Sequence, residues 1–321
     1  MSGPDAVEDR SDQRPRALCL MGPTAAGKTA IAVALAERHG FAAISVDSAL
    51  VYRGMDVGTA KPDAATLARV PHALVDIREP GQAYSAAEFR TDALREMAQA
   101  HAAGRIPLLV GGTGLYFRAL TRGLSALPGA DPEVRAAIEG EASRHGWAVL
   151  HRQLATADPV AASRIHPNDP QRIQRALEVL ALTGQPISAR QHGGSARPPW
   201  RFLRIVLSPA KRALLHERVV RRFHAMLEAG FVDEVRRLRE RPGLHPDLPA
   251  IRAVGYRQVW GYLEGDYGLD EAISRGVHAT RQLAKRQLTW LRSERDAIWV
   301  DPLAVDGLGR VSRLVADFLG R

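Results

Sequence analysis

The sequence is poor in cysteine and in long apolar runs. Its only cysteine, Cys19, cannot form an intramolecular disulfide, and its place in a short apolar segment predicts a buried core residue. No apolar run approaches the roughly 18 residues that a membrane-spanning helix needs. The polar segment from Ser2 to Arg16 lacks the apolar stretch of a signal peptide. We therefore expect a cytoplasmic protein with no membrane segment and a disordered leader over residues 1–16.

Acidic side chains are too few to balance the basic ones. The chain has 35 Asp and Glu residues against 44 Lys and Arg, which gives a formal net charge of +9. Such an excess favours a polyanionic partner, such as a nucleic acid or an anionic surface. The richness in Ala and Arg also fits a bias in genome base composition, so the charge alone leaves both explanations open.

One segment of the chain fits the phosphate-binding loop pattern G-x-x-x-x-G-K-[ST]. It consists of Gly22, Pro23, Thr24, Ala25, Ala26, Gly27, Lys28 and Thr29. An apolar run at 17–21 predicts a buried strand before it, and residues 30–38 predict a helix after it that ends at Gly40. Backbone N–H groups of such a loop form an anion nest, Lys28 adds a positive charge, and Thr29 offers its hydroxyl to Mg²⁺. The segment therefore predicts the binding of two or more linked phosphates, whatever molecule carries them.

Alternating strand and helix patterns predict the fold class. Further apolar runs at 41–46, 72–75 and 106–110 look like strands of the same sheet, and a helical pattern at 86–103 separates the last two. This alternation predicts an α/β fold in which helices flank a parallel, doubly wound sheet like that of the P-loop NTPases. Because such sheets bind ligands beyond the carboxyl ends of their strands, the residues that follow each strand are candidates for the site.

The middle of the chain differs in character from its two ends. From residue 131 to about 182 the pattern is wholly helical, and Asp131 and Asp169 each precede a proline as helix caps do. A strand pattern returns at 202–207, and mostly helical patterns follow it. We therefore expect a helical insertion domain at 128–196 between the two parts of a catalytic core, residues 17–127 and 197–321.

Two strand ends carry candidates for chemistry. Asp47 follows the second strand, where a carboxylate can hold Mg²⁺ through water, accept a proton from a nucleophile, or merely cap a turn. Residues 111–116, with the sequence GGTGLY, follow the fourth strand, where an NTPase often has an acid. They offer backbone amides and the Thr113 hydroxyl to a phosphate or a base, although a close-packed turn would also use these glycines.

Basic residues share a helix face in two segments. Arg172 and Arg175 lie three residues apart, and Arg281, Lys285 and Arg292 fall on one face of a later helix. Such stripes suit the phosphate backbone of a nucleic acid, while a solvated helix face is the alternative.

Two more segments are candidates for ligand contacts. Residues 253–258 place Tyr256 beside an arginine and an amide, a set that can stack on and hydrogen-bond an unpaired base. One basic helix offers three candidates for a diphosphate contact, among which the sequence does not choose: Arg218, Arg221 and Arg222.

Together these segments resemble the tRNA dimethylallyltransferase family. The resemblance covers essentially the whole chain from Leu18 to Asp301. Its most specific part is the block 47–62, DSALVYRGMDVGTAKP, which is far more distinctive than the phosphate loop. Ala26 stands where the family often has Ser or Val, and this difference has no bearing on the chemistry. The other matching segments are 22–29, 111–116, 171–175, 253–258 and 285–292.

The resemblance implies a reaction and a set of site residues. The reaction transfers a dimethylallyl group from dimethylallyl diphosphate to N6 of the adenosine directly 3′ of the anticodon, in tRNAs that read codons beginning with U, and releases diphosphate. Mg²⁺ is the implied cofactor, with Thr29 as its ligand, loop 22–29 binds the diphosphate, and Asp47, Thr113 and Arg222 are the implied catalytic residues. The implied contacts to the tRNA anticodon stem-loop are Asp47, Ser48, Ala49, Leu50, Thr113, Arg135, Gln171, Arg172, Ile173, Gln174, Arg175, Arg252, Ala253, Val254, Gly255, Tyr256, Arg257, Lys285, Arg286, Gln287 and Arg292. We also expect the insertion domain to contact tRNA and the protein to be a monomer.

Other functions remain as alternatives. A small-molecule kinase, acting on a nucleoside or nucleotide, would use the phosphate loop and the insertion as a lid, but it would leave the basic stripes without a role. A prenyltransferase acting on a free adenine nucleotide would use the same donor. A non-catalytic RNA-binding module would not need the intact Lys28, Thr29 and Asp47.

Overall fold

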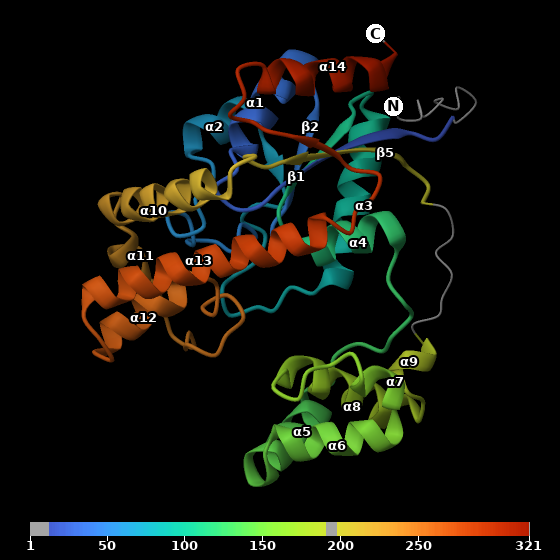
Figure 1. The fold of residues 1–321 in the computed structure, drawn as a ribbon, viewed down its shortest axis with the longest axis vertical. Coiled ribbons are helices and arrows are strands. Elements are labelled where there is room, and N and C mark those ends of the chain that lie inside the picture. The colour runs from blue at the N-terminus through green and yellow to red at the C-terminus, as the bar shows by residue number, and fades with distance from the viewer. Residues whose placement is uncertain (1–12, 191–197, 321) are drawn as a thin grey trace. The chain divides into compact units, whose positions relative to one another are not determined.

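The computed structural model describes residues 13–190 and 198–320 (Figure 1). The chain divides into two compact units, with boundaries after Thr121 and before Pro198, whereas the sequence placed them at 127 and 197. Residues 1–12 of the expected leader lie outside the described part, and Arg16, its last residue, begins the first strand. Among the described residues, no helix is both long enough and apolar enough to cross a membrane.

A parallel sheet forms the centre of the larger unit. Within the described residues it has six strands in the order β3-β2-β4-β1-β5-β6. They are β1 (Arg16–Met21), β2 (Ala42–Val46), β3 (His72–Ala73), β4 (Pro107–Gly111), β5 (Arg201–Leu207) and β6 (Ile298–Val300). This confirms the predicted α/β fold of the P-loop NTPase type. The strand expected at 72–75 ends at Ala73, because Leu74 has a φ of 62° and so leaves the extended conformation.

Helices cover both faces of this sheet. Side chains alternate along each strand, so each face carries apolar side chains that a helix can bury. Leu18 and Leu20 of β1 pack on the side of α1 and α14. Ala17, Cys19 and Met21 pack on the side of α3 and α4, so Cys19 is buried as predicted. The helices of the sheet layers are α1 (Lys28–His39), α2 (Ala64–Arg69), α3 (Ala86–Ala102), α4 (Gly114–Arg122) and α14 (Gly307–Leu319).

A helical layer packs on the segment that follows β2. Its members are α10 (Arg212–Glu228), α11 (Phe231–Arg239), α12 (Tyr256–Glu264) and α13 (Leu269–Leu291). Val51 and Met55 are wholly buried in one apolar cluster with Phe223 of α10, Phe231 of α11 and Val259 of α12. The distinctive block 47–62 is therefore held in place by helices that come some 170 residues or more later in the chain.

Over residues 122–190, the described part of the smaller unit, all the regular elements are helices, as the sequence predicted for 131–182. Its helices are α5 (Pro132–His145), α6 (Trp147–Ala157), α7 (Pro159–Ala162), α8 (Pro170–Thr183) and α9 (Ile187–Arg190). The predicted starts of α5 and α8 are confirmed, because the carboxylates of Asp131 and Asp169 accept N–H groups of the first turns. The core of this unit includes Leu150, Leu154 and Ile173, each of which is fully buried.

Candidate active site

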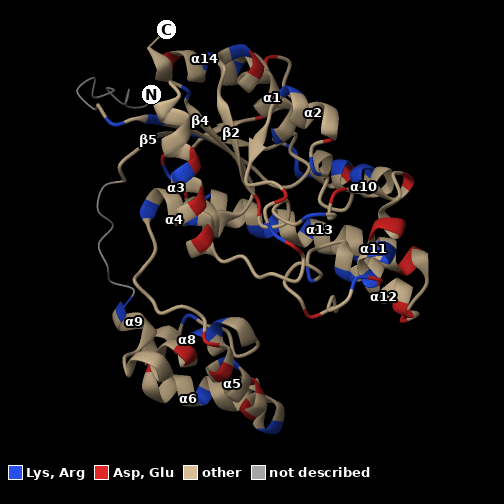
Figure 2. Cartoon of the chain, turned by 180° about the vertical axis from the view of Figure 1, so that it is seen from behind, with Lys and Arg blue, Asp and Glu red and all other residues tan. Residues whose placement is uncertain are grey.

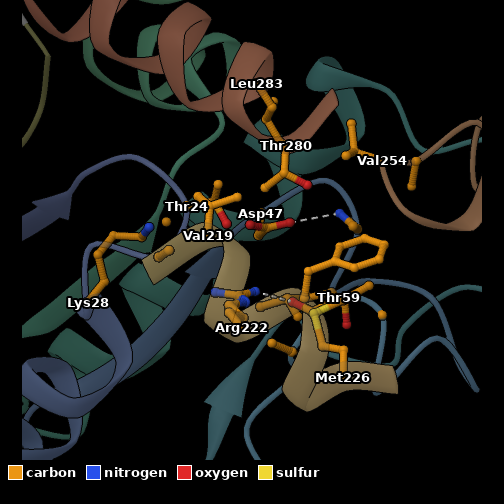
Figure 3. A pocket seen from close by; sticks show the side chains of 18 of the residues that line it. Thr24, Lys28, Asp47, Thr59, Val219, Arg222, Met226, Val254, Thr280 and Leu283 are labelled. Carbon is orange, nitrogen blue, oxygen red and sulfur yellow. Dashed lines mark hydrogen bonds between the residues drawn. The ribbon is translucent and has the colours of Figure 1, made fainter. Parts of the chain in front are cut away.

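Three neighbouring strands end at the candidate site. β2, β4 and β1 lie side by side in the sheet, and their carboxyl ends lead into Asp47, into Gly112 and Thr113, and into the loop 22–29. The predicted clustering of these segments at one edge of the sheet is therefore confirmed. Figure 3 shows Lys28, Asp47 and Arg222 around one cavity, although they come from α1, the end of β2 and α10.

The loop 22–29 has the geometry of an anion nest. Ala25 and Gly27 have φ angles of 63° and 93°, the left-handed backbone conformation that occurs in such nests. Lys28 Nζ donates to the carbonyl oxygens of Gly22 at 3.0 Å and Pro23 at 2.8 Å. Burial lowers the pKa of Lys28 to about 8, with a raising effect of Asp47 and a further lowering effect of Arg222. A bound anion would restore the charged form of Lys28, so this loop is poised to accept negative charge.

Asp47 is held by its own turn and faces this cavity. Its Oδ1 accepts the N–H of Ala49 at 2.9 Å, and the carboxylate is half-buried. The next residue, Ser48, donates its N–H to Thr113 Oγ1 at 3.1 Å, and its hydroxyl lies 3.4 Å from the same atom. The hydroxyl of Thr113 thus ties the loop after β4 to the loop after β2. This contact helps to fix the turn that carries Asp47.

The structure distinguishes the three arginines of α10. Arg222 lines the cavity, and its Nη2 donates to the carbonyl oxygen of Thr59 at 3.0 Å (Figure 3). Burial lowers the pKa of Arg222, and the carboxylate of Asp47 acts in the opposite direction. Arg218 donates to the carbonyl oxygen of Ala25 at 2.7 Å and so braces the phosphate loop, while Arg221 is exposed. Arg222 is therefore the one of the three that can face a bound diphosphate.

Two adjoining cavities meet at Asp47. The first encloses about 1040 Å³, part of it open to solvent, and combines charged groups with apolar walls from Val219, Met226 and Leu283. The second is lined by Ser48, Thr113, Arg252, Arg286 and Trp290, among others. The residues that line both are Asp47, Ala49, Ala253, Val254, Leu283 and Gln287. An anion with an apolar group in the first cavity can therefore lie next to a flat polar group in the second.

Gln287 has a role at the site that the helical pattern did not show. It is only 9% exposed, its Oε1 accepts the N–H of Thr24 at 2.8 Å, and its Nε2 donates to the carbonyl oxygen of Gly112 at 3.1 Å. The side chain thus joins the phosphate loop to the loop after β4. Its predicted tRNA contact would have to be made from this buried position, at the wall shared by the two cavities.

The stacking role predicted for Tyr256 is wrong for this structure. The ring is fully buried against Phe231, and its hydroxyl donates to Glu234 Oε1 at 2.5 Å. Gln258 is also buried and accepts the N–H of Gly255 at 2.8 Å. An isolated sequence window shows an aromatic residue but not the helix that covers it. Within 252–257 the side chains of Arg252 and Arg257 are the exposed ones.

The basic face of α13 is largely available to a partner. Lys285, Arg286 and Arg292 are exposed, and Arg281 is half-buried. Figure 2 marks the Lys and Arg positions of the chain in blue, those of α13 among them. The part of α13 from residue 276 to its end at 291 contains no acidic residue. This face keeps the positive charge that the sequence predicted for it.

In the smaller unit, the predicted tRNA contacts have different environments. Arg172 is exposed, whereas Ile173 is fully buried in the core of the unit and cannot contact a partner in this structure. Arg135 and Arg175 both bind the buried carboxylate of Glu178, at 2.7 Å and 2.6 Å. Burial alone would raise the pKa of Glu178, but the hydrogen bonds from the two arginines lower it to about 2. Glu178, which sequence reasoning missed, therefore holds both guanidinium groups in place.

The remaining predicted tRNA contacts include exposed side chains and side chains that bind within the protein. Ser48, Ala49 and Leu50 lie in the turn after β2 and are exposed or half-buried. In α8, Gln171 is exposed, and Gln174 donates to Glu139 Oε1 at 2.8 Å.

Comparison with known proteins identifies relatives of this chain. The sequence model of the IPP transferase family matches residues 50–294 of this chain. A protein of Alkalilimnicola ehrlichii named tRNA dimethylallyltransferase is 60% identical over 310 residues, which cover 96% of this chain and 98% of that protein. A protein of Bordetella pertussis with the same name is 58% identical over 300 residues, covering 92% and 96% of the two chains.

A solved structure has the same fold over nearly the full length. The tRNA isopentenylpyrophosphate transferase of Bacillus halodurans is 37% identical, with a TM-score of 0.71, and the match covers 96% of this chain and 97% of that one. The fold of this chain is thus shared with an experimentally determined structure.

Proposed function

The chain belongs to the IPP transferase family, and we propose that it is a tRNA dimethylallyltransferase. It moves a dimethylallyl group from dimethylallyl diphosphate to N6 of the adenosine directly 3′ of the anticodon, in tRNAs that read codons beginning with U. The observation that carries the proposal is the meeting of two cavities at Asp47. One offers cations for a diphosphate and apolar walls for a carbon chain, and the other offers a polar opening for a base.

The diphosphate binds in the first cavity. N–H groups of loop 22–29 other than those of Thr24 and Ala26, which bind within the protein, hold its oxygens. Lys28 of α1 and Arg222 of α10 supply two positive charges. As the bond between carbon and oxygen breaks, negative charge grows on the leaving diphosphate. The burial that lowers the pKa of both cations also means that little water screens their attraction to that charge.

The adenine amine reaches Asp47 through the second cavity. Its lone pair is delocalised into the ring, so the amine is a weak nucleophile until its proton is drawn away. The amine nitrogen attacks the first carbon of the dimethylallyl group, the carbon–oxygen bond breaks with its electron pair going to diphosphate, and the amine proton passes to Asp47. General base catalysis of this kind contributes about 10²–10⁴-fold to a rate. Thr113 keeps Asp47 in place through the N–H of Ser48.

Mg²⁺ fits the oxygen donors of the first cavity. The hydroxyl of Thr29 lines it, and Mg²⁺ binds well to one such protein oxygen together with substrate phosphates. Among the described residues no group of three or more His, Cys, Asp or Glu side chains could hold a metal by itself. When bound, Mg²⁺ would neutralise part of the charge of the leaving diphosphate.

The tRNA partner binds through its anticodon stem-loop. The exposed cations of α13, together with Arg252 and Arg172, contact its phosphates, and the helical insertion takes part in this contact. Drawing the target base out of its stack costs a few kcal/mol, which these contacts offset. We also place the protein in the cytoplasm, as a monomer.

A labelling experiment tests the proposal directly. The full-length protein is incubated with radiolabelled dimethylallyl diphosphate, Mg²⁺ and unmodified tRNA, and the label is expected on the adenosine 3′ of the anticodon. The matched control is the same tRNA with guanosine at that position, which is expected to stay unlabelled. Label on adenosine monophosphate instead of tRNA, or ATP-dependent phosphorylation of a nucleoside, would replace the proposal by one of the two enzymatic alternatives.

A further inference from the structure

Glu234 is a buried carboxylate that takes no direct part in the chemistry described above. It lies on α11 and is only 3% exposed. Its Oε2 accepts the backbone N–H groups of Asp56 at 2.9 Å and Val57 at 2.7 Å. Its Oε1 accepts the N–H of Gly58 at 3.1 Å and the hydroxyl of Tyr256 at 2.5 Å. A carboxylate has about four positions for hydrogen-bond donors, so every one of them is used.

These contacts fix the loop 56–58 against α11. Three successive N–H groups form a concave donor set that elsewhere in proteins binds free anions, and here a side chain from a later helix fills it. Gly58 is pressed so closely on this helix that a Cβ would lie 2.1 Å from the ring of Phe231. Burial and the nearby carboxylate of Glu234 raise the pKa of Tyr256, so its hydroxyl keeps its proton and donates. The loop therefore has one tightly determined position.

The same loop continues into the first cavity. Thr59 follows Gly58, and its carbonyl oxygen accepts the Nη2 of Arg222 at 3.0 Å (Figure 3). Gly58, Thr59 and Ala60 line the cavity together with Arg222 and the phosphate loop. The direction of the Arg222 guanidinium therefore depends on where the Thr59 carbonyl lies, and that position depends on the N–H groups bound to Glu234.

We propose that Glu234 is a positioning residue for diphosphate binding, which acts through the Thr59 carbonyl to hold Arg222 in the first cavity. The inference rests on the proposed function, because it takes the first cavity as the diphosphate site. A carboxylate suits this task, since it accepts donors on both oxygens. Glutamine has the same shape but would turn an amide N–H₂ toward at least one of the backbone N–H groups, which would then lose its partner.

The first test compares Glu234→Gln with Asp233→Asn. Asp233 is the adjacent residue of α11, is exposed, and does not contact the loop 56–58, so its variant controls for the loss of a negative charge. The affinity for inorganic pyrophosphate with Mg²⁺ is measured by calorimetry, and the KM for tRNA is measured in parallel. We expect Glu234→Gln to weaken pyrophosphate binding about ten-fold, the effect of one hydrogen bond to a charged group, with little change in the KM for tRNA. An unchanged pyrophosphate affinity, or an equal rise in the KM for tRNA, would overturn the inference.

A double-mutant cycle with Arg222→Ala separates positioning from general destabilisation. If Glu234 acts through Arg222, the effect of Glu234→Gln on pyrophosphate binding disappears in the Arg222→Ala background. Additive effects of the two changes would refute the proposed connection. Arg222→Ala by itself tests the proposed function, because a normal pyrophosphate affinity in that variant would remove the diphosphate site. If Glu234→Gln does not fold, Tyr256→Phe removes one donor to Glu234 and is expected to give a smaller loss with the same dependence on Arg222.

Discussion

Replacing Asp47 by asparagine should separate catalysis from substrate binding. Asparagine keeps an oxygen that can accept the N–H of Ala49, so the turn after β2 is expected to keep its conformation. It also leaves the contact between Ser48 and Thr113 untouched, because that contact uses the backbone N–H of Ser48. What the substitution removes is the negative charge and the capacity to take a proton from the adenine amine.

The size of the effect follows from the role of the carboxylate. Losing a general base costs about 10²–10⁴-fold in kcat, which corresponds to roughly 3–5 kcal/mol in the activation barrier. Diphosphate binding should change in the other direction. Asp47 raises the pKa of Lys28 and of Arg222, so it lies close enough to repel a bound anion as well. Pyrophosphate affinity in Asp47→Asn is therefore expected to be equal to that of the parent protein or somewhat higher.

Single-turnover prenylation of tRNA and calorimetry with pyrophosphate measure the two quantities independently. Asp247→Asn is the matched control, because Asp247 is almost fully exposed and lies outside the site. A single-turnover rate constant within about three-fold of the parent value would exclude Asp47 as the general base, since base catalysis contributes at least about 10²-fold. A large loss of pyrophosphate affinity would instead show that Asp47 acts mainly by holding the donor and its metal.

Three other predictions concern charge and packing. Burial lowers the pKa of Lys28 to about 8, so pyrophosphate affinity should fall as the pH rises through 8, and calorimetry should show no such step in Lys28→Met. Gly111→Ala would bring a Cβ to 2.0 Å from the carbonyl oxygen of Val46 and should cost about 1–3 kcal/mol of stability, measured by thermal melts. Gly140→Ala is the control, because Gly140 has open space around it, and this variant should stabilise its helix slightly. Glu178→Ala should destabilise the smaller unit by about 2 kcal/mol in denaturant titrations. Because the folded pKa of Glu178 is lowered to about 2, its contribution should be complete above pH 4.5 and lost as the pH falls toward 2.

Much of the catalytic edge of the sheet could be predicted from the sequence. The phosphate loop, Asp47 and Thr113 each follow a short apolar run, and the carboxyl ends of parallel strands meet at one edge. The helix starts at Asp131 and Asp169 were predictable for a similar reason, because a cap and the proline after it act within one turn. All of these signals are local, so they need no knowledge of how distant segments pack.

Partners far apart in the chain were not predictable. The sequence offered Arg218, Arg221 and Arg222 without distinction, and only the packing of α10 on the segment after β2 brings Arg222 to Thr59, 163 residues away. Tyr256 was predicted to stack on an unpaired base, but it packs against the ring of Phe231 and binds the carboxylate of Glu234, both of which come from α11. Helical spacing gives the face on which a residue lies, and it does not say whether that face meets solvent or another helix.

The chemical groups of the candidate site can be recognised from the order of the residues alone. Three features can be read from residue type and local order. They are the phosphate-loop pattern with Lys28, the carboxylate of Asp47 and the excess of basic residues. The tertiary structure decided which side chains are free to act. Glu234 and Gln287 join distant segments from inside the fold, because a buried polar group must find its hydrogen-bond partners wherever the chain brings them.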